Sequence, residues 1–234
     1  MKNYFKTLLL LAFISTQKAT AQEKFFKSAT FDTRVASQYL AGRAGFVVED
    51  EPVVQNYLDV SSNAGTFYCW SNSKIDEKDL SEVDLGWISP PVSKDYIGTN
   101  FCVSGFTFPN TSNTWKDFEA GLNIFSKNLP LGINYYGAVN YSNGYLSKVQ
   151  KLSLGRGFSF EDFNIEFDAN LVYSNGYYSK NHGFTHGTIG AKLSKKISNG
   201  LEFYVGTILQ KELGSKEKVR NDVMVYTGLK LRLK

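Results

Sequence analysis

The sequence lacks long apolar segments, and it has few cysteines, histidines and prolines. Its 234 residues include two Cys, two His and five Pro. After the apolar stretch 8–14, no segment approaches the roughly 20 apolar residues that a membrane-spanning helix needs. The mature chain is therefore expected to have no helical membrane anchor. With no second long apolar segment, only strands could carry this chain through a bilayer.

The two cysteines, Cys69 and Cys102, are predicted to be free thiols. They fall on two predicted strands that have a third strand between them. At about 4.8 Å per strand, this separation exceeds the reach of a disulfide bond. If the strand count is wrong, the two could still pair. The first Cys lies far from the start of the chain, so an N-terminal lipoprotein is also disfavoured.

Because the sequence has two histidines, few residues could serve as a catalytic base. His182 and His186 are the two candidate bases, and Ser179 is a candidate nucleophile for an acyl hydrolase or transferase. We prefer to interpret the surrounding segment 175–184, rich in Gly, Asn and Tyr, as a solvated loop. In extended chain the two histidines would lie about 13 Å apart, too far to share a metal ion. A tight turn at Gly183 would shorten that distance. We predict no catalytic residue, no metal site and no cofactor.

The net charge is small once the first residues are set aside. Lys2 and Lys6 precede the apolar stretch, and Ala19-Thr20-Ala21 follows it, which is the order of a secretory signal peptide. Cleavage is expected after Ala21, leaving 22–234 as a single domain. Removing the leader takes three of the 26 basic residues and none of the 22 acidic ones, leaving 23 against 22. This balance argues against a nucleic-acid partner.

The mature chain consists of short alternating segments. In 164–174, Glu166 and Asp168 alternate with Ile165 and Phe167, so a strand there would have one polar and one apolar face. Similar runs recur about twelve times, each of roughly ten residues, the length that a tilted strand needs to cross a bilayer. The runs are 31–40, 53–61, 66–72, 81–89, 100–108, 117–126, 131–141, 145–154, 164–174, 185–195, 201–210 and 222–233.

Turn residues separate these runs. Ser62-Asn63-Ala64-Gly65, Ser142-Asn143-Gly144 and Ser198-Asn199-Gly200 are strong hairpin signals. All five prolines lie at or beyond the ends of runs, where a missing amide donor does not disturb a ladder. The longer connections are expected outside the cell, at 41–52, 74–80, 110–116, 175–184 and 213–221.

These patterns predict an all-β fold, a closed antiparallel transmembrane β-barrel of about 12 strands. The polar face carries charges of both signs, and the apolar face is rich in Phe, Tyr, Trp and Leu, as expected for a band that faces lipid. An even strand count also suits closure, which removes sheet edges from the membrane. A secreted soluble β-sandwich with similar alternation is the alternative.

The polar side chains of the alternation are expected to line the lumen. If Lys230 and Arg232 faced lipid instead, each would cost about 2 to 4 kcal/mol near the midplane. Lys148 and Gln150 are also assigned inward, whereas the faces of 66–72 and 100–108 are not assigned. The predicted lumen-lining residues are Asp32, Arg34, Gln55, Asp59, Glu82, Asp84, Glu119, Asn134, Glu166, Asp168, Asn170, His186, Lys192, Glu202, Lys230 and Arg232.

The first third of the mature chain resembles a known family. The stretches are Ser37-Gln38-Tyr39, then Arg43, then Glu51-Pro52-Val53-Val54-Gln55, followed by a strand with Trp70 and the Glu82-Val83-Asp84 strand. They are similar to the start of the TorF-like porin family, small bacterial outer-membrane β-barrels. The resemblance continues through the mature chain mainly as pattern. It implies an outer-membrane barrel and a pore, and it supplies no catalytic residues.

The expected size of the barrel limits its function. Twelve strands tilted near 40° give a backbone radius of roughly 12 Å, so inward side chains must fill much of the width. We expect a narrow channel for small polar solutes, surrounded by outer-membrane lipid. A structural barrel plugged by its own salt bridges is the alternative. Among the charged residues expected inward, eight are acidic and four are basic, which predicts a mild preference for cations.

Overall fold

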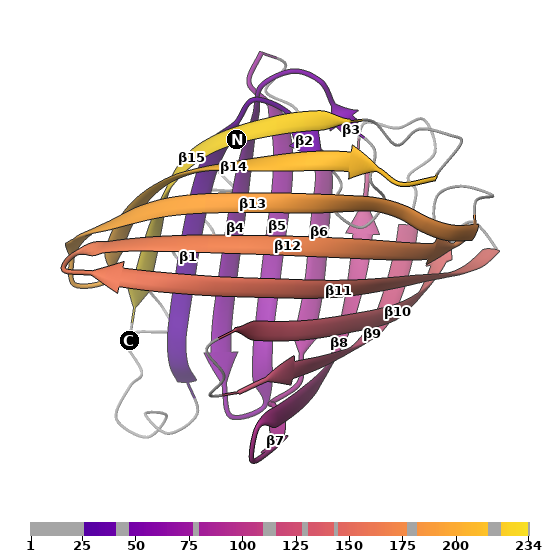
Figure 1. Ribbon diagram of the computed structural model, residues 1–234, viewed down its shortest axis with the longest axis horizontal. Helices are drawn as coiled ribbons and strands as arrows, with labels where there is room; N and C mark the ends of the chain where they lie inside the picture. Colours follow the sequence, from indigo (N-terminus) through magenta and orange to yellow (C-terminus); the bar gives the residue numbers. More distant parts are fainter. Residues whose placement is uncertain are drawn as a thin grey trace.

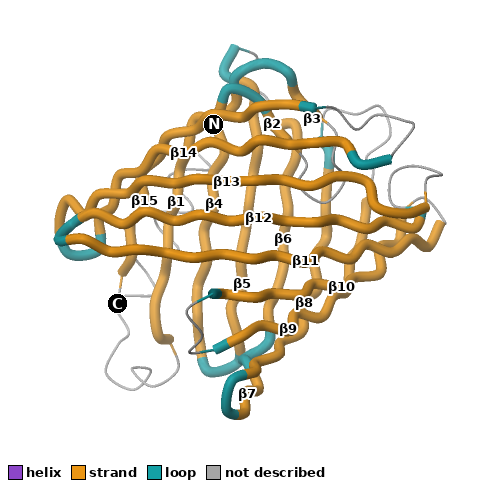
Figure 2. The backbone as a smooth tube through the Cα atoms, viewed as in Figure 1, coloured by secondary structure: helices purple, strands orange, loops and turns teal. Residues whose placement is uncertain are grey.

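The computed structural model describes residues 26–40, 47–76, 80–109, 116–127, 131–142, 145–176, 182–214 and 221–233. The predicted signal peptide and its cleavage after Ala21 lie outside these residues. Within the described ranges the regular structure is β-strand (Figure 2). The strands are β1 (Phe26–Ala36), β2 (Tyr39–Leu40), β3 (Val47–Glu49), β4 (Val53–Ser62), β5 (Gly65–Lys74), β6 (Leu80–Ile88), β7 (Val92–Lys94), β8 (Ile97–Thr107), β9 (Lys116–Ser126), β10 (Gly132–Ser142), β11 (Tyr145–Phe160), β12 (Phe163–Asn175), β13 (His182–Ser198), β14 (Leu201–Glu212) and β15 (Asp222–Leu233).

No helix within the described part of the chain is long and apolar enough to cross a membrane.

Twelve of the strands form a closed antiparallel barrel. Around the ring the order is β1, β4, β5, β6, β8, β9 and onward to β15, and β15 pairs with β1. The pairing of β6 with β8 completes the closure, while β7 adds a short extension along β8. The strands of the front wall, β11 to β14, cross those of the rear wall, β1 and β4 to β6 (Figure 1). The predicted fold class is confirmed.

Each of the twelve predicted runs corresponds to one strand of the ring. The turn 63–64 joins β4 to β5, and the turn 199–200 joins β13 to β14, as the hairpin signals predicted. Gly65 and Gly200 adopt positive φ angles of 122° and 88°, which explains glycine there. The third signal, Ser142-Asn143-Gly144, falls between β10 and β11, but Asn143 and Gly144 lie outside the described residues.

The barrel has two distinct ends. Both ends of the described chain, Phe26 and Leu233, lie at the end that carries the turns 63–64, 161–162 and 199–200. The opposite end carries the connections 37–52, 75–79, 108–115, 143–144, 176–181 and 213–221. The strand ends that flank the five long predicted connections therefore all lie at this one end; the predicted location of these connections outside the cell stays a prediction. We refer to these as the turn end and the loop end.

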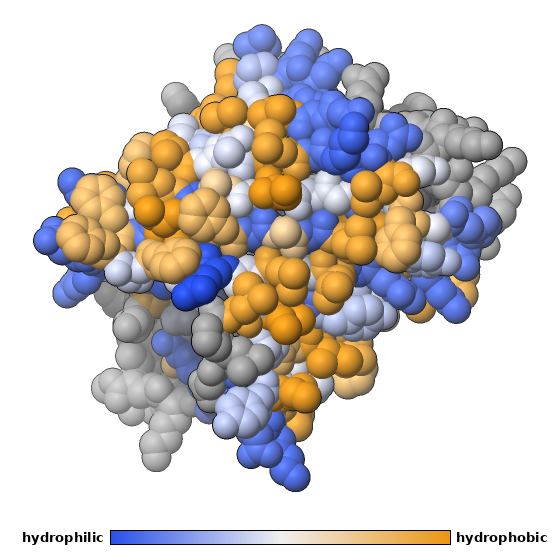
Figure 3. All heavy atoms as spheres, in the orientation of Figure 1, coloured by the Kyte–Doolittle hydropathy of each residue, from blue (hydrophilic) through white to orange (hydrophobic). Residues whose placement is uncertain are grey.

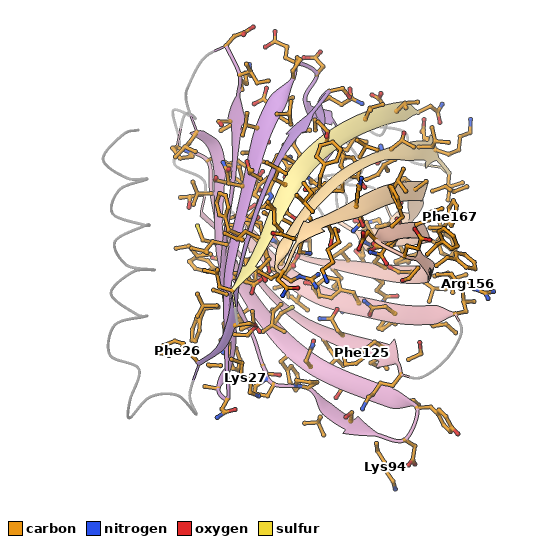
Figure 4. The ribbon with its side chains drawn as sticks, turned by 90° about the vertical axis from the view of Figure 1, so that its left-hand side faces the viewer. Phe26, Lys27, Lys94, Phe125, Arg156 and Phe167 are labelled. Atoms are coloured by element: carbon orange, nitrogen blue, oxygen red, sulfur yellow. The ribbon has the colours of Figure 1, made fainter. Side chains whose placement is uncertain are left out.

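The two faces of the wall differ in composition. Residues directly opposite one another in an antiparallel pair share a face, so the registers assign each side chain to the enclosed or the outer face. Apolar side chains dominate the outer face and cover much of the surface over β10 to β14 (Figure 3). Arg156 and Phe167, opposite one another on β11 and β12, lie on this outer side (Figure 4). The outer face is therefore the one suited to lipid.

The eighth run has the opposite orientation to the one predicted. Lys148 and Gln150 pair with Val139 and Gly137 on the outer face and are exposed. Val149, fully buried, points inward from the same strand and packs in an apolar cluster with Cys102, Tyr136, Ala138 and Val172. The assignment of Lys148 and Gln150 to the interior was wrong because burial of Val149 decides the face of this strand.

The unassigned runs also have defined faces. On β5, Tyr68, Trp70 and Asn72 point inward, and on β8 the inward residues include Cys102 and Ser104. Cys69 lies on the outer face of β5, two strands away from Cys102, and both are free thiols. The prediction of unpaired cysteines is confirmed, because the wall itself separates the two sulfur atoms.

Candidate channel interior

The loop half of the barrel interior is tightly filled. Each of the twelve strands contributes at least one inward side chain that is no more than 8% exposed. We call this set the occluding layer. Its members are Ala36, Val53, Gln55, Asn72, Glu82, Cys102, Ser104, Phe106, Asp117, Glu119, Tyr136, Ala138, Asn140, Ser147, Val149, Val172, Ser174, His186, Gln210 and Met224.

Hydrogen bonds hold several polar members of the occluding layer. The Tyr136 hydroxyl donates to Glu119, and the Cys102 thiol donates to the same hydroxyl oxygen. The hydroxyls of Tyr68 and Ser104 lie 2.5 Å apart, within hydrogen-bond distance. Buried polar groups that are paired in this way specify one arrangement of a core, whereas unpaired groups would destabilise it. The loop half is therefore built like a protein core with polar components.

The turn half of the interior is more open and strongly charged. Its charged side chains are partly or largely exposed and carry both signs. Opposite charges alternate along one row, in which Asp32 faces Lys230, Lys230 faces Glu202, and Glu202 faces Lys196. Glu166 and Lys192 form an ion pair at 2.8 Å. Eight of the charged residues in this half were predicted from the sequence to line the lumen, and we call these the charged vestibule: Asp32, Asp59, Glu166, Asp168, Lys192, Glu202, Lys230 and Arg232.

A ladder of hydrogen bonds crosses the rear wall between the vestibule and the occluding layer. Arg34 Nε donates to Gln55 Oε1 at 2.5 Å, and Gln55 Nε2 donates to Asn72 Oδ1 at 3.0 Å. Asn72 Nδ2 in turn donates to the Ser81 hydroxyl at 2.7 Å. The Arg34 guanidinium also lies over the Tyr226 ring, 5.4 Å from its centroid. These contacts fix the orientation of both the guanidinium and the Gln55 amide.

A cavity of about 210 Å³ lies beside this ladder. Asp32, Tyr57 and Trp70 contribute to it from one cross-strand row, on β1, β4 and β5. Arg34 and Gln55 contribute from the next row. Tyr204 enters from β14 and donates its hydroxyl hydrogen to Asp32. The cavity therefore combines three aromatic rings with one acid, one base and the Gln55 amide, and Asn56 of β4 also borders it.

The β2–β3 hairpin folds back into the loop end. Gln38, just before it, is buried and donates from Nε2 to Asp222 Oδ1 at 2.7 Å and to the Val223 carbonyl at 3.0 Å. Leu40 packs in an apolar cluster with Ala36, Val53 and Met224. Apolar burial and these two hydrogen bonds hold the segment against the inner wall.

Two further contacts link the hairpin to the rear wall. The Tyr39 ring lies 5.3 Å from the Trp70 ring, centroid to centroid, so the hairpin borders the cavity. Lys74, at the end of β5, pairs with Glu49 at 3.3 Å and with Glu51 at 3.9 Å. Three of the stretches that carry the TorF-like resemblance, namely 37–39, 51–55 and the Trp70 strand, thus come together at this place, while Arg43 lies outside the described residues.

All sixteen residues predicted to line the lumen lie on the enclosed face. Gln55, Glu82, Glu119 and His186 belong to the occluding layer. Asp84, Asn134 and Asn170 are more accessible, and Asn170 donates to Asp168 at 2.7 Å and to Thr188 at 2.9 Å. The eight vestibule residues and Arg34 complete the set.

Sequence reasoning missed the aromatic and hairpin contributions. Trp70 lies on a strand whose faces were not assigned, and Gln38 and Tyr39 were placed at the end of the first run. Tyr204 shares the polar face of the run 201–210 with Glu202 and Gln210, and this position could have identified it as an inward residue. Contacts between a loop and a distant wall have no sequence periodicity, so the pairing of Tyr39 with Trp70 could not be read from the pattern.

The two histidines occupy different environments. His186 is fully buried, and its Nδ1 lies 3.0 Å from the Thr185 hydroxyl. His182 is exposed at the start of β13. Ser179, the candidate nucleophile, lies outside the described residues. Within the described ranges, no group of three or more His, Cys, Asp or Glu side chains is arranged to hold a metal ion.

Comparison with known proteins gives similarity at the level of structure. No protein-family model matches the chain, and no curated protein does. Among solved structures, the KdgM porin in complex with disordered oligogalacturonate superimposes with a TM-score of 0.57 at 10% identity, covering 88% of this chain and 98% of that one. The NanC porin gives 0.59 at 10% identity, covering 87% and 100%. At this identity the likeness concerns the fold, and the chain has the barrel fold of these small porins.

Proposed function

We propose that this protein is a narrow porin-like channel of the bacterial outer membrane that admits small polar solutes. The charged vestibule carries this proposal, because eight charged side chains on an enclosed face remain accessible to solvent. A barrel with a purely structural role would have no need to keep such a surface hydrated. The proposal includes export through a cleaved signal peptide and membership of the TorF-like porin family.

The likeness to KdgM and NanC supports the solute class. The first of these structures holds an oligogalacturonate, a hydroxylated and charged solute. This chain presents carboxylates, cations and amides on the corresponding enclosed face of the same type of barrel. Such groups can form hydrogen bonds with a polar solute in place of those the solute makes with water. A narrow pore selects among solutes in this way. Lipid would surround the outer face.

We expect purified protein in planar lipid bilayers to give small, discrete conductance steps. The steps should be small because the occluding layer and the β2–β3 hairpin narrow the loop half. The measurement is single-channel current at fixed voltage in KCl, with protein heated to unfold it as the control. Absence of steps from folded, heat-modifiable protein would contradict a channel.

The conducting state should prefer cations mildly. Together with Lys196, the vestibule has five acidic and four basic side chains, and the rest of the enclosed face includes Glu82, Asp84 and Glu119 against Arg34 and Lys151, so the enclosed face is acidic on balance. The reversal potential in a KCl gradient measures this preference. The double variant Glu166→Gln with Asp168→Asn should shift the reversal potential towards anions, whereas Lys148→Gln on the outer face should leave it unchanged. A reversal potential favouring anions in the unmodified protein would refute the prediction.

A closed structural barrel is the second candidate function. The occluding layer favours it, because buried inward side chains on all twelve strands leave little room for a continuous water path in the described conformation. The two functions differ in one observable property. A structural barrel would insert in the same bilayers and carry no current, whereas a channel would conduct ions past the β2–β3 hairpin.

A further inference from the structure

We propose that the cavity of about 210 Å³ beneath the β2–β3 hairpin is a binding site for a single pyranose ring of an uncharged sugar. This inference rests on the proposed channel function and specifies its solute. The site lies between two cross-strand rows of the rear wall, one with Asp32, Tyr57 and Trp70 and the other with Arg34 and Gln55. A solute that moves between vestibule and hairpin would meet it.

Three aromatic rings give the cavity its apolar surface. Tyr57 is directly opposite Trp70, and its ring stacks on Tyr68 with centroids 5.9 Å apart and planes 27° apart. The Tyr204 ring packs edge-on against Tyr226, 6.0 Å between centroids. Each ring is therefore held by a neighbour. A pyranose presents C–H bonds on its faces and hydroxyls around its edge, so it suits rigid aromatic surfaces bordered by polar groups.

The polar groups of the cavity are planar and held in place. Asp32 accepts from Tyr204, and Arg34 and Gln55 are joined by a hydrogen bond of 2.5 Å. A carboxylate and a guanidinium can each bond two neighbouring atoms of a ligand at once, while the Gln55 amide holds the Arg34 guanidinium in place. Adjacent sugar hydroxyls offer donor and acceptor pairs at this spacing. Because Gln55 is 2% exposed and also bonded to Asn72, its orientation is set before a ligand arrives.

Charge and size select the ligand class further. The cavity lining contains one acid and one base, so its own charge cancels; Lys230, opposite Asp32, is not part of the lining, and a sugar acid would face the carboxylate of Asp32 with no second cation among the lining residues. Its volume of about 210 Å³ equals that of about seven water molecules at roughly 30 Å³ each, which one six-membered sugar ring would fill. On the side of the hairpin, the Tyr39 ring packs against Trp70, one of the lining rings.

Fluorescence of Trp70 tests the site directly. The variant Trp87→Phe with Trp115→Phe leaves Trp70 as the single tryptophan, since the chain contains three. We expect D-galactose to change its emission saturably, with a Kd of about 1 to 10 mM, as a ligand of this size allows. D-galacturonate should bind at least several-fold more weakly, and glycerol should give no saturable change. Equal or tighter binding of galacturonate would overturn the assignment to uncharged sugars.

A charge variant provides an independent check. Asp32→Asn keeps the shape of the side chain and an acceptor for Tyr204 while removing the negative charge. It should improve galacturonate binding several-fold and change galactose binding by less than a factor of about three. If the variant leaves the ratio of the two affinities unchanged, Asp32 does not contact the solute and the proposal is wrong. Heat-modifiable gel mobility confirms that each variant is folded.

Current recordings separate this inference from the channel function. Galactose at several millimolar should reduce the conductance of the unmodified protein, and Trp70→Leu should raise the concentration needed by about tenfold. Tyr141→Leu, an aromatic replacement on the outer face, is the matched control. Conductance that no sugar changes, with unaltered Trp70 emission, would refute the sugar site and leave the channel standing.

Discussion

Removing the β2–β3 hairpin should raise the single-channel conductance several-fold. Ala36 and Val53 are directly paired, so the ends of β1 and β4 already lie side by side at the loop end. A Gly-Ser turn of about four residues can therefore replace residues 38–51 without separating the strands. The replacement takes Tyr39 away from Trp70 and Leu40 out of the cluster with Met224. The current step in planar bilayers measures the change.

Point variants test the same feature at full chain length. Gln38→Ala with Tyr39→Ala removes the two hydrogen bonds to β15 and the ring contact, and it should give an intermediate or fluctuating conductance. Tyr141→Ala, on the outer face, supplies a matched tyrosine replacement that should behave like the unmodified protein. If the hairpin-free barrel conducts no better than the original, the constriction lies in the occluding layer alone.

Gly228→Ala should strongly impair closure of the barrel. Gly228 lies on β15 opposite Arg34, at the seam between the last and the first strand. A Cβ atom there would come within 2.5 Å of the Thr33 carbonyl oxygen and within 2.5 Å of the Tyr204 hydroxyl. The carbonyl belongs to the neighbouring backbone and has little freedom to move. We expect a loss of about 3 kcal/mol in the free energy of unfolding, measured by urea-dependent refolding into detergent micelles.

Two further variants test whether the loss of stability in Gly228→Ala comes from the close contacts at the seam. At Gly105, on the outer face, an added Cβ would be 3.7 Å from its nearest neighbour, so Gly105→Ala should change stability by less than about 0.5 kcal/mol. Adding Tyr204→Phe to Gly228→Ala relieves the contact with the hydroxyl and leaves the one with Thr33, so rescue should be partial. A Gly228→Ala barrel as stable as the original would show that the seam can shift at low cost.

Much of the barrel could be predicted from the sequence because its lipid-facing side must be apolar. That requirement produced clear alternation in strands such as β12, where Glu166 and Asp168 face inward and Ile165 and Phe167 outward. The number of strands and the free thiols followed from it, whereas some limits did not: β1 is Phe26–Ala36 where 31–40 was predicted, and β11 runs on to Phe160 where 145–154 was predicted. Where the inward side chains are themselves apolar, the alternation no longer distinguishes the enclosed face from the lipid-facing one. Val149 on β11 shows this, since it is fully buried on the enclosed face.

The candidate site was harder to predict, for a related reason. Its charged members, such as Asp32 and Arg34, appear in the alternation of a single strand. Its aromatic members are ambiguous, because a Trp or Tyr suits a lipid-facing band as well as a polar interior. The hairpin depends on contacts with residues far away in the sequence, as between Gln38 and Asp222. No periodic signal reports such contacts.

The unequal lengths of the strands have a consequence for the surrounding bilayer. β11 and β13 contain 16 and 17 residues, whereas β6 on the opposite side contains nine. Apolar side chains continue along the long strands as far as Phe160 and Ile197 beside their turns, 73% and 56% exposed. Lipid must therefore match a taller hydrophobic wall on one side than on the other. The molecule can meet this mismatch by leaning in the membrane or by thickening the leaflet locally, at a cost of fractions of a kcal/mol per Å.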